Sequence, residues 1–75
     1  MSQKPTYQVV LLPSVNHTLK AEKLLKGQCI PCKLIPVPRH ISSDCGICLR
    51  ITPEVRQAVA DALQEMADLI VIHDL

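Results

Sequence analysis

Four cysteines dominate the chemistry that this 75-residue sequence could perform. They form two CxxC pairs, Cys29 with Cys32 and Cys45 with Cys48, and twelve residues separate the pairs. Two such pairs are typical of sites in which four thiolates hold one zinc ion or an iron–sulfur cluster. Metal ligation by all four cysteines is therefore one hypothesis for this chain.

Cys45 has a different setting from the other cysteines. It ends a polar segment that begins with Arg39 and His40, and Gly46 follows it. Cationic neighbours favour the thiolate, which is the reactive form of cysteine, and a glycine lets the backbone approach a ligand closely. Asp44 acts in the opposite direction. Cys45 is thus the candidate nucleophile, with Arg39, His40 and Gly46 around it, and the alternative is a half-buried thiol in a turn.

The remaining cysteines have simpler interpretations. Cys32 and Cys48 are expected to be small core residues on strands, and Cys29 to be incidental. A reversible dithiol of Cys45 and Cys48 is a further alternative. It requires a turn or bulge at Gly46, because residues three apart on a strand point to opposite faces.

The first half of the chain predicts a strand followed by a helix. Residues 7–12 form the strand, and the unbroken apolar run Val9–Leu12 indicates a central position with both faces buried. Ser14 is a good N-cap for a helix over Val15–Lys26, and Gly27 is expected to end that helix.

The second half predicts two strands, a helix and a last strand. Cys32–Val37 reads as a strand, and because Pro36 and Pro38 cannot both donate to a central ladder, this strand should lie at an edge of the sheet. The other expected elements are a loop over Arg39–Asp44, a strand over Gly46–Ile51, a helix that starts at Thr52-Pro53, and a strand over Leu69–His73. The apolar residues that recur at helical spacing in this helix are Val55, Val59, Ala62 or Leu63, and Met66.

This order of elements, β-α-β-β-α-β, predicts an α+β fold of the ferredoxin-like type. Right-handed crossovers then give a four-stranded antiparallel sheet with both helices on one face. Residues 1–75 are expected to form a single domain. Its core should be thin, since a chain of this size buries only about 60% of its extended surface, and assembly into a homo-oligomer would supplement it.

The predicted hairpin weakens the metal hypothesis. If residues 32–38 pair with 45–51, Cys45 lies near the turn, whereas Cys29 and Cys32 lie at the open end. At about 3.3 Å of rise per residue, the two CxxC pairs would be on the order of 15–20 Å apart. Ligands that share one tetrahedral metal ion must lie within about 4 Å of one another.

The composition limits the classes of partner that this chain is expected to bind. The net charge is +1 and the only aromatic residue is one tyrosine, so nucleic-acid binding is not expected. No apolar run approaches the roughly 20 residues of a membrane span. We expect a cytoplasmic protein, in which the cysteines are thiols, thiolates or metal ligands rather than structural disulfides. Nothing in the sequence indicates an organic cofactor.

Four segments resemble the pattern of a small bacterial and archaeal family known as putative selenium/sulfur carrier protein-like. These segments are Leu12-Pro13-Ser14, Ala21-Glu22-Lys23-Leu24-Leu25-Lys26, Pro36-Val37-Pro38-Arg39 and Ser42-Ser43-Asp44-Cys45-Gly46. The resemblance implies a βαββαβ domain in which Cys45 holds sulfur or selenium as a persulfide or selenosulfide. Cys29, Cys32 and Cys48 do not belong to the family pattern.

Such a carrier would exchange its cargo with cysteine desulfurase or sulfurtransferase-type proteins, and it would be an accessory protein rather than a free-standing enzyme. Transfer by thiolate exchange at sulfur requires no general acid or base. A different class of function stays open beside it: a non-catalytic ferredoxin-like binding or regulatory module, in which Cys45 and Gly46 only form a turn.

Overall fold

The computed structural model describes residues 6–41 and 46–75, which form four strands, two helices and two short 3₁₀ helices. In chain order they are β1 (Gln8–Leu11), α1 (Val15–Gly27), β2 (Lys33–Pro36), β3 (Ile47–Ile51), η1 (Pro53–Val55), α2 (Arg56–Ala62), η2 (Gln64–Met66) and β4 (Val71–Asp74). Residues 42–45, which include the last part of the predicted loop and Cys45, lie outside the described ranges.

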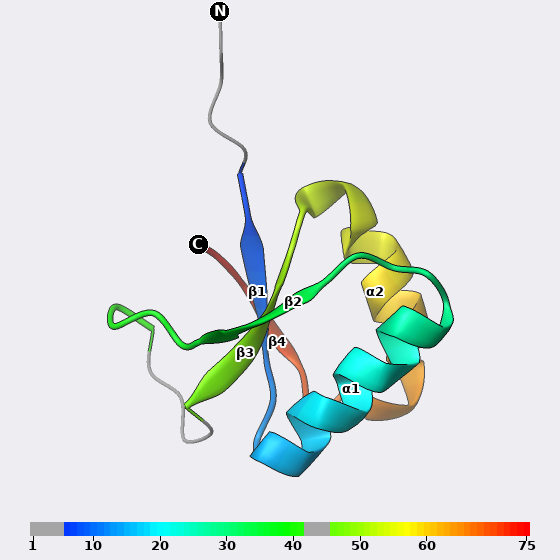
Figure 1. Cartoon of the computed structure of the whole chain (residues 1–75), viewed down its shortest axis with the longest axis horizontal. Coiled ribbons are helices and arrows are strands. Elements are labelled where there is room, and N and C mark those ends of the chain that lie inside the picture. The colour runs from blue at the N-terminus through cyan, green and yellow to red at the C-terminus, as the bar shows by residue number, and fades with distance from the viewer. Residues whose placement is uncertain (1–5, 42–45) are drawn as a thin grey trace, which may run out of the picture.

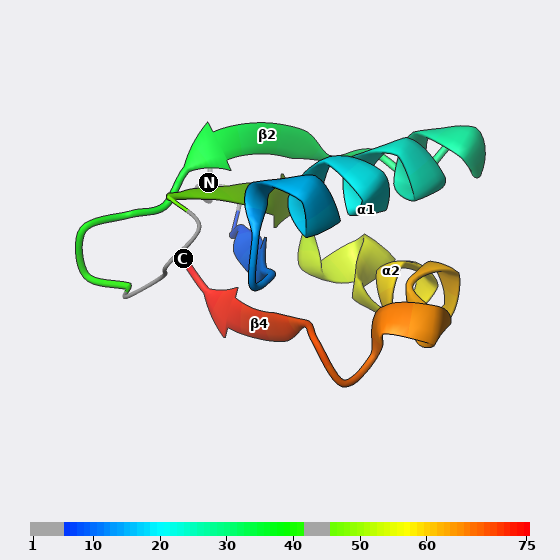
Figure 2. The same cartoon turned by 90° about the horizontal axis from the view of Figure 1, so that it is seen from below.

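The strands form one sheet in the order β2-β3-β1-β4, with every neighbouring pair antiparallel. Both helices pack against the same face of this sheet, and the segment that follows β2 extends on the other side (Figure 1, Figure 2). The predicted ferredoxin-like α+β fold is confirmed. Within the described ranges, no helix has the length and apolar character to cross a membrane.

The central strand β1 is buried on both faces, as its unbroken apolar run predicts. Val10 faces the helices and belongs to the larger core cluster, together with residues of α1, β3, α2 and η2. Val9 and Leu11 point to the opposite face, which we call the open face, and join a smaller cluster with Cys48. Since successive side chains of a strand alternate between faces, one strand supplies both clusters.

Strand β2 lies at an edge of the sheet, which agrees with the prediction from its prolines. Pro36 ends the strand opposite Ile47. A proline on an edge strand can direct its missing N–H away from the ladder, so no sheet hydrogen bond has to be lost. The register of this hairpin also sets Lys33 opposite Arg50 and Ile35 opposite Cys48.

The start of α1 agrees with the prediction, whereas its end differs from it. The Ser14 hydroxyl caps the helix by accepting a hydrogen bond from the His17 N–H, at 3.2 Å. Gly27, expected to end the helix, is instead its last helical residue, and Cys29 takes the left-handed conformation with φ 58°. The Cys29 N–H donates to the Lys26 carbonyl, and the Ile30 N–H to the Leu25 carbonyl.

These two hydrogen bonds form a Schellman motif, with Cys29 at the position that glycine usually occupies. The packing of Ile30 and Leu25 in the same core cluster completes it. The buried Ile30 side chain fixes where the chain leaves the helix, so the motif persists although a cysteine is strained in this conformation.

The second helix is more fragmented than its periodic pattern predicts. A 3₁₀ turn precedes α2 and another follows it, so the α-helical part covers only Arg56–Ala62. The Thr52 side chain makes no capping hydrogen bond. Val59 and Met66 are nevertheless buried, as predicted. The change of helix type still turns the apolar side chains toward the sheet.

Replacement of Cys29 by glycine should stabilise the protein, because glycine adopts the left-handed conformation without the cost of about 1 kcal/mol that a Cβ imposes. The companion change Gly27→Ala should also stabilise it, by about 0.5–1 kcal/mol, since Gly27 is helical and its Cβ would meet nothing within 4 Å. Urea unfolding measures both. Destabilisation by Gly27→Ala would contradict this assignment, because it would indicate that Gly27, and not Cys29, adopts the left-handed backbone conformation.

Candidate functional site

A turn over residues 38–41 presents the two basic side chains that the sequence singles out. The Ile41 N–H donates to the Pro38 carbonyl at 3.0 Å, which closes the turn around Arg39 and His40. Both side chains are exposed. The turn therefore offers two hydrogen-bond donors, of which Arg39 is always cationic.

Two contacts fix this turn to the sheet. The Val37 N–H donates to the Gly46 carbonyl at 3.1 Å, which extends the β2–β3 hairpin one pair beyond Pro36. The side chains of Val37 and Ile41 pack on the open-face cluster, which contains Cys48. Ile41 thus holds the end of the turn against the sheet.

Gly46 has a conformational role. Its φ is +80°, a value that L residues adopt only with strain, and a Cβ there would have open space around it. The backbone geometry, rather than a crowded approach, therefore explains the glycine. Cys45, the predicted nucleophile, falls in the segment Ser42–Cys45 and lies outside the described residues.

Cys32 lies directly before β2 and packs against the helix-side core. Burial is the main cause that raises the pKa of its thiol, the Glu22 carboxylate raises it further, and the Lys26 ammonium opposes both. A raised pKa keeps the thiol protonated, which is the unreactive form. Cys32 is therefore a poor nucleophile at neutral pH.

Cys48 and Cys29 occupy different environments from Cys32. Cys48 is fully buried in the open-face cluster, on the opposite side of the sheet from Cys32. Cys29 is exposed at the end of α1. The expected core position of Cys48 is confirmed. Within residues 6–41 and 46–75, no group of three or more histidine, cysteine or acidic side chains could hold a metal ion.

Two histidines outside the turn have structural or peripheral settings. The His17 Nδ1 lies 2.6 Å from the Ser14 hydroxyl, within the N-cap of α1. His73 is on the edge strand β4, paired with Val9 and exposed. Sequence reasoning overlooked Ile41, the residue that anchors the turn. Its signal was a lone β-branched apolar side chain in an otherwise polar loop.

Comparison with known proteins finds one family. The model of the family described as "Putative Se/S carrier protein-like" matches residues 7–70, which is most of the chain. Searches of curated proteins and of solved structures found no match.

Alkylation of Cys32 should respond to the two charges that α1 directs at it. Glu22→Gln removes a negative charge, lowers the pKa of the thiol and should speed alkylation at pH 8 by about two- to fivefold. Lys26→Gln should slow it by a similar factor. Peptide-resolved mass spectrometry after timed iodoacetamide treatment measures the rates, with the exposed Lys23→Gln as control. Equal rates in all variants would contradict the assigned cause.

Truncation of Ile41 should expose Cys48. Ile41→Ala removes part of the cover of the open-face cluster, so alkylation of Cys48 should accelerate by about tenfold. Leu19→Ala serves as the matched control, because Leu19 is an exposed apolar residue on α1, away from this cluster. If both variants left Cys48 equally protected, Ile41 would not be the anchor.

Proposed function

This chain belongs to the family described as "Putative Se/S carrier protein-like", and we propose that it carries sulfur or selenium on Cys45, as a persulfide or a selenosulfide. Family membership is the observation that carries this proposal, because the matched residues 7–70 include the whole β2–β3 hairpin and its loop. Cys45 and Gly46 belong to the Ser-Ser-x-Cys-Gly segment on which the resemblance to this family rests.

The geometry of the turn supports the proposal. Arg39 and His40 are exposed, and they precede Cys45 by only a few residues. A guanidinium and an imidazole near a thiolate or a persulfide anion lower the free energy of the charged form. Ile41 packs on the open-face cluster and the Val37 N–H donates to the Gly46 carbonyl, so the turn that carries these two side chains is fixed at the loop end of the hairpin.

The transfer step needs no oxidant. The Cys45 thiolate attacks the terminal sulfur of a donor persulfide, a new sulfur–sulfur bond forms to Cys45, and the bond within the donor persulfide breaks. The electron pair of that bond leaves on the donor thiolate, so no net oxidation occurs. Delivery to an acceptor thiolate is the same exchange in reverse, and selenium in the terminal position follows the same scheme.

Such a protein acts between other proteins. Its donor would be of the cysteine desulfurase or sulfurtransferase class, both of which present an enzyme-bound persulfide. The exposed turn, rather than a deep cavity, suits contact with a second protein surface. We infer that the chain is an accessory carrier, that it acts in a reducing compartment such as the cytoplasm, and that it has no turnover of its own.

Persulfide loading tests the proposal. Incubation of the wild type with a cysteine desulfurase and cysteine should add one sulfur atom to the peptide that contains Cys45, measured by intact-protein and peptide mass spectrometry. Cys45→Ser should lose this gain, whereas Cys29→Ser, which removes an exposed cysteine, should retain it. Arg39→Gln combined with His40→Gln should slow loading by about three- to tenfold.

Two outcomes would reject the carrier role. Sulfur could accumulate on Cys29 in place of Cys45, or no cysteine could gain mass while the donor is active. If Cys45→Ser also left folding and partner binding unchanged, the chain would be a binding module in which Cys45 has no chemical task.

A further inference from the structure

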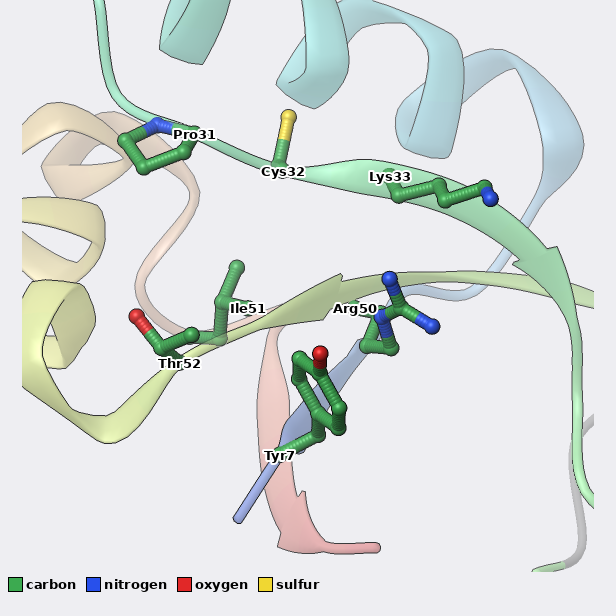
Figure 3. Close-up of a pocket in the computed structure, with 7 residues that line it drawn as sticks. All are labelled: Tyr7, Pro31, Cys32, Lys33, Arg50, Ile51 and Thr52. Atoms are coloured by element: carbon green, nitrogen blue, oxygen red, sulfur yellow. The ribbon is translucent and has the colours of Figure 1, made fainter. Parts of the chain in front are cut away.

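A concave site lies at the opposite end of the β2–β3 hairpin from the Arg39–His40 turn. It is a pocket of about 170 Å³, lined by Tyr7, by residues 31–33 and by residues 50–52 (Figure 3). The pair of Lys33 with Arg50 is three residue pairs from the pair of Pro36 with Ile47, which adjoins the loop. At about 3.3 Å per residue, the pocket is therefore roughly 10 Å or more from the end of the hairpin that carries the turn.

Two cationic side chains lie next to each other in this pocket. Lys33 and Arg50 are direct partners in the antiparallel ladder, so they share one face of the sheet with their Cβ atoms about 5 Å apart. Like charges in this arrangement destabilise a sheet. In the described part of the chain the ion pairs join Lys20 to Glu65 and Lys26 to Glu22, so neither pocket cation has a carboxylate partner there.

The ring of Tyr7 holds the guanidinium of Arg50 in place. The guanidinium carbon lies 4.2 Å from the ring centroid, a cation–π contact that orients the group without neutralising its charge. A planar guanidinium stacked by one face keeps its N–H groups free in its own plane, where they can bind an oxyanion in a bidentate way. Thr52 also lines the pocket.

No negative group of the pocket lining offsets these charges. Figure 3 shows the Cys32 sulfur directed toward α1, away from Lys33 and Arg50. The thiol is also held in its neutral form by burial. The described lining contains no aspartate or glutamate. Two cations, an oriented guanidinium and the absence of a carboxylate from the described lining favour the binding of negative charge.

The size of the pocket favours a small ligand. Its volume of about 170 Å³ is below the roughly 300–1,000 Å³ of pockets for drug-sized ligands. We propose that this pocket is a binding site for a small inorganic oxyanion of the sulfate or phosphate type, held by Arg50 and Lys33. This inference is independent of Cys45 and of the proposed carrier function.

Anion titration followed by ¹H–¹⁵N NMR tests the site. Sodium sulfate and, separately, sodium phosphate are added at constant ionic strength, with chloride as the balancing anion, so that general screening does not change. The proposal expects saturable shifts in the amide signals of residues 32–33 and 50–52. Addition of acetate distinguishes a site for carboxylates from one for inorganic oxyanions.

Variants assign the effect to the two cations. Arg50→Gln should weaken sulfate and phosphate binding by at least about tenfold, because charge-assisted hydrogen bonds are lost. Lys33→Gln lies on an exposed edge position, should fold normally and should weaken binding by about threefold. Arg56→Gln and Lys23→Gln remove the same charges at exposed positions outside the pocket, and they should leave the affinity unchanged.

The same experiment can overturn the inference. Shifts that grow linearly, shifts spread equally over the lysines of α1, or equal weakening by Arg56→Gln would all mean general ionic effects. Saturation with acetate alone would mean that the site is not one for inorganic oxyanions. Repeating the titration with Cys45→Ser separates the two proposals, since anion binding should persist when persulfide loading is lost.

Discussion

The burial of β1 on both faces is the constraint on which the other features of this structure depend. Val9 and Val10 are each completely removed from solvent, on opposite sides of one strand. The helices cover only one of those sides. The chain must therefore supply a second cover, and it does so with Ile35, Val37 and Ile41, at the end of β2 and in the turn after it. The position of Arg39 and His40 is a consequence of this hydrophobic packing, because the turn that contains them is attached through Ile41.

The β2–β3 hairpin separates two kinds of chemistry. Next to its closed end, the turn over residues 38–41 carries the two exposed basic residues. At its open end, the register brings Lys33 beside Arg50, and Tyr7 at the start of the central strand supports the guanidinium. A continuous antiparallel ladder lies between the two ends. Strong coupling between them would require an element with two arrangements.

The sequence predicted those features that local residue types determine. The central place of β1 followed from its unbroken apolar run, the edge place of β2 from two prolines, and the start of α1 from a serine. Features set by tertiary packing were not predictable in this way. Cys29 adopts a left-handed conformation because Ile30 has to reach the core, and no glycine marks that position. The second helix breaks into shorter pieces although its apolar period continues. The pairing of Lys33 with Arg50 depends on register, which no single segment encodes.

The spacing of the cysteines predicts a shared site only if the fold brings the thiols together. A CxxC pair places two thiols together when it lies in a tight turn, but here Cys29 belongs to a helix end, and Cys32 points to the helices. Cys48 faces the other side of the sheet, beneath the turn. Burial removes Cys48 from solvent and raises the pKa of the Cys32 thiol, so both thiols are less reactive, on opposite sides of the sheet.

For a carrier this arrangement has a chemical advantage, since persulfide sulfur migrates to any accessible thiolate. Low reactivity of the neighbouring thiols would keep the cargo on Cys45, and the exposed Cys29 is the described cysteine most able to compete for it.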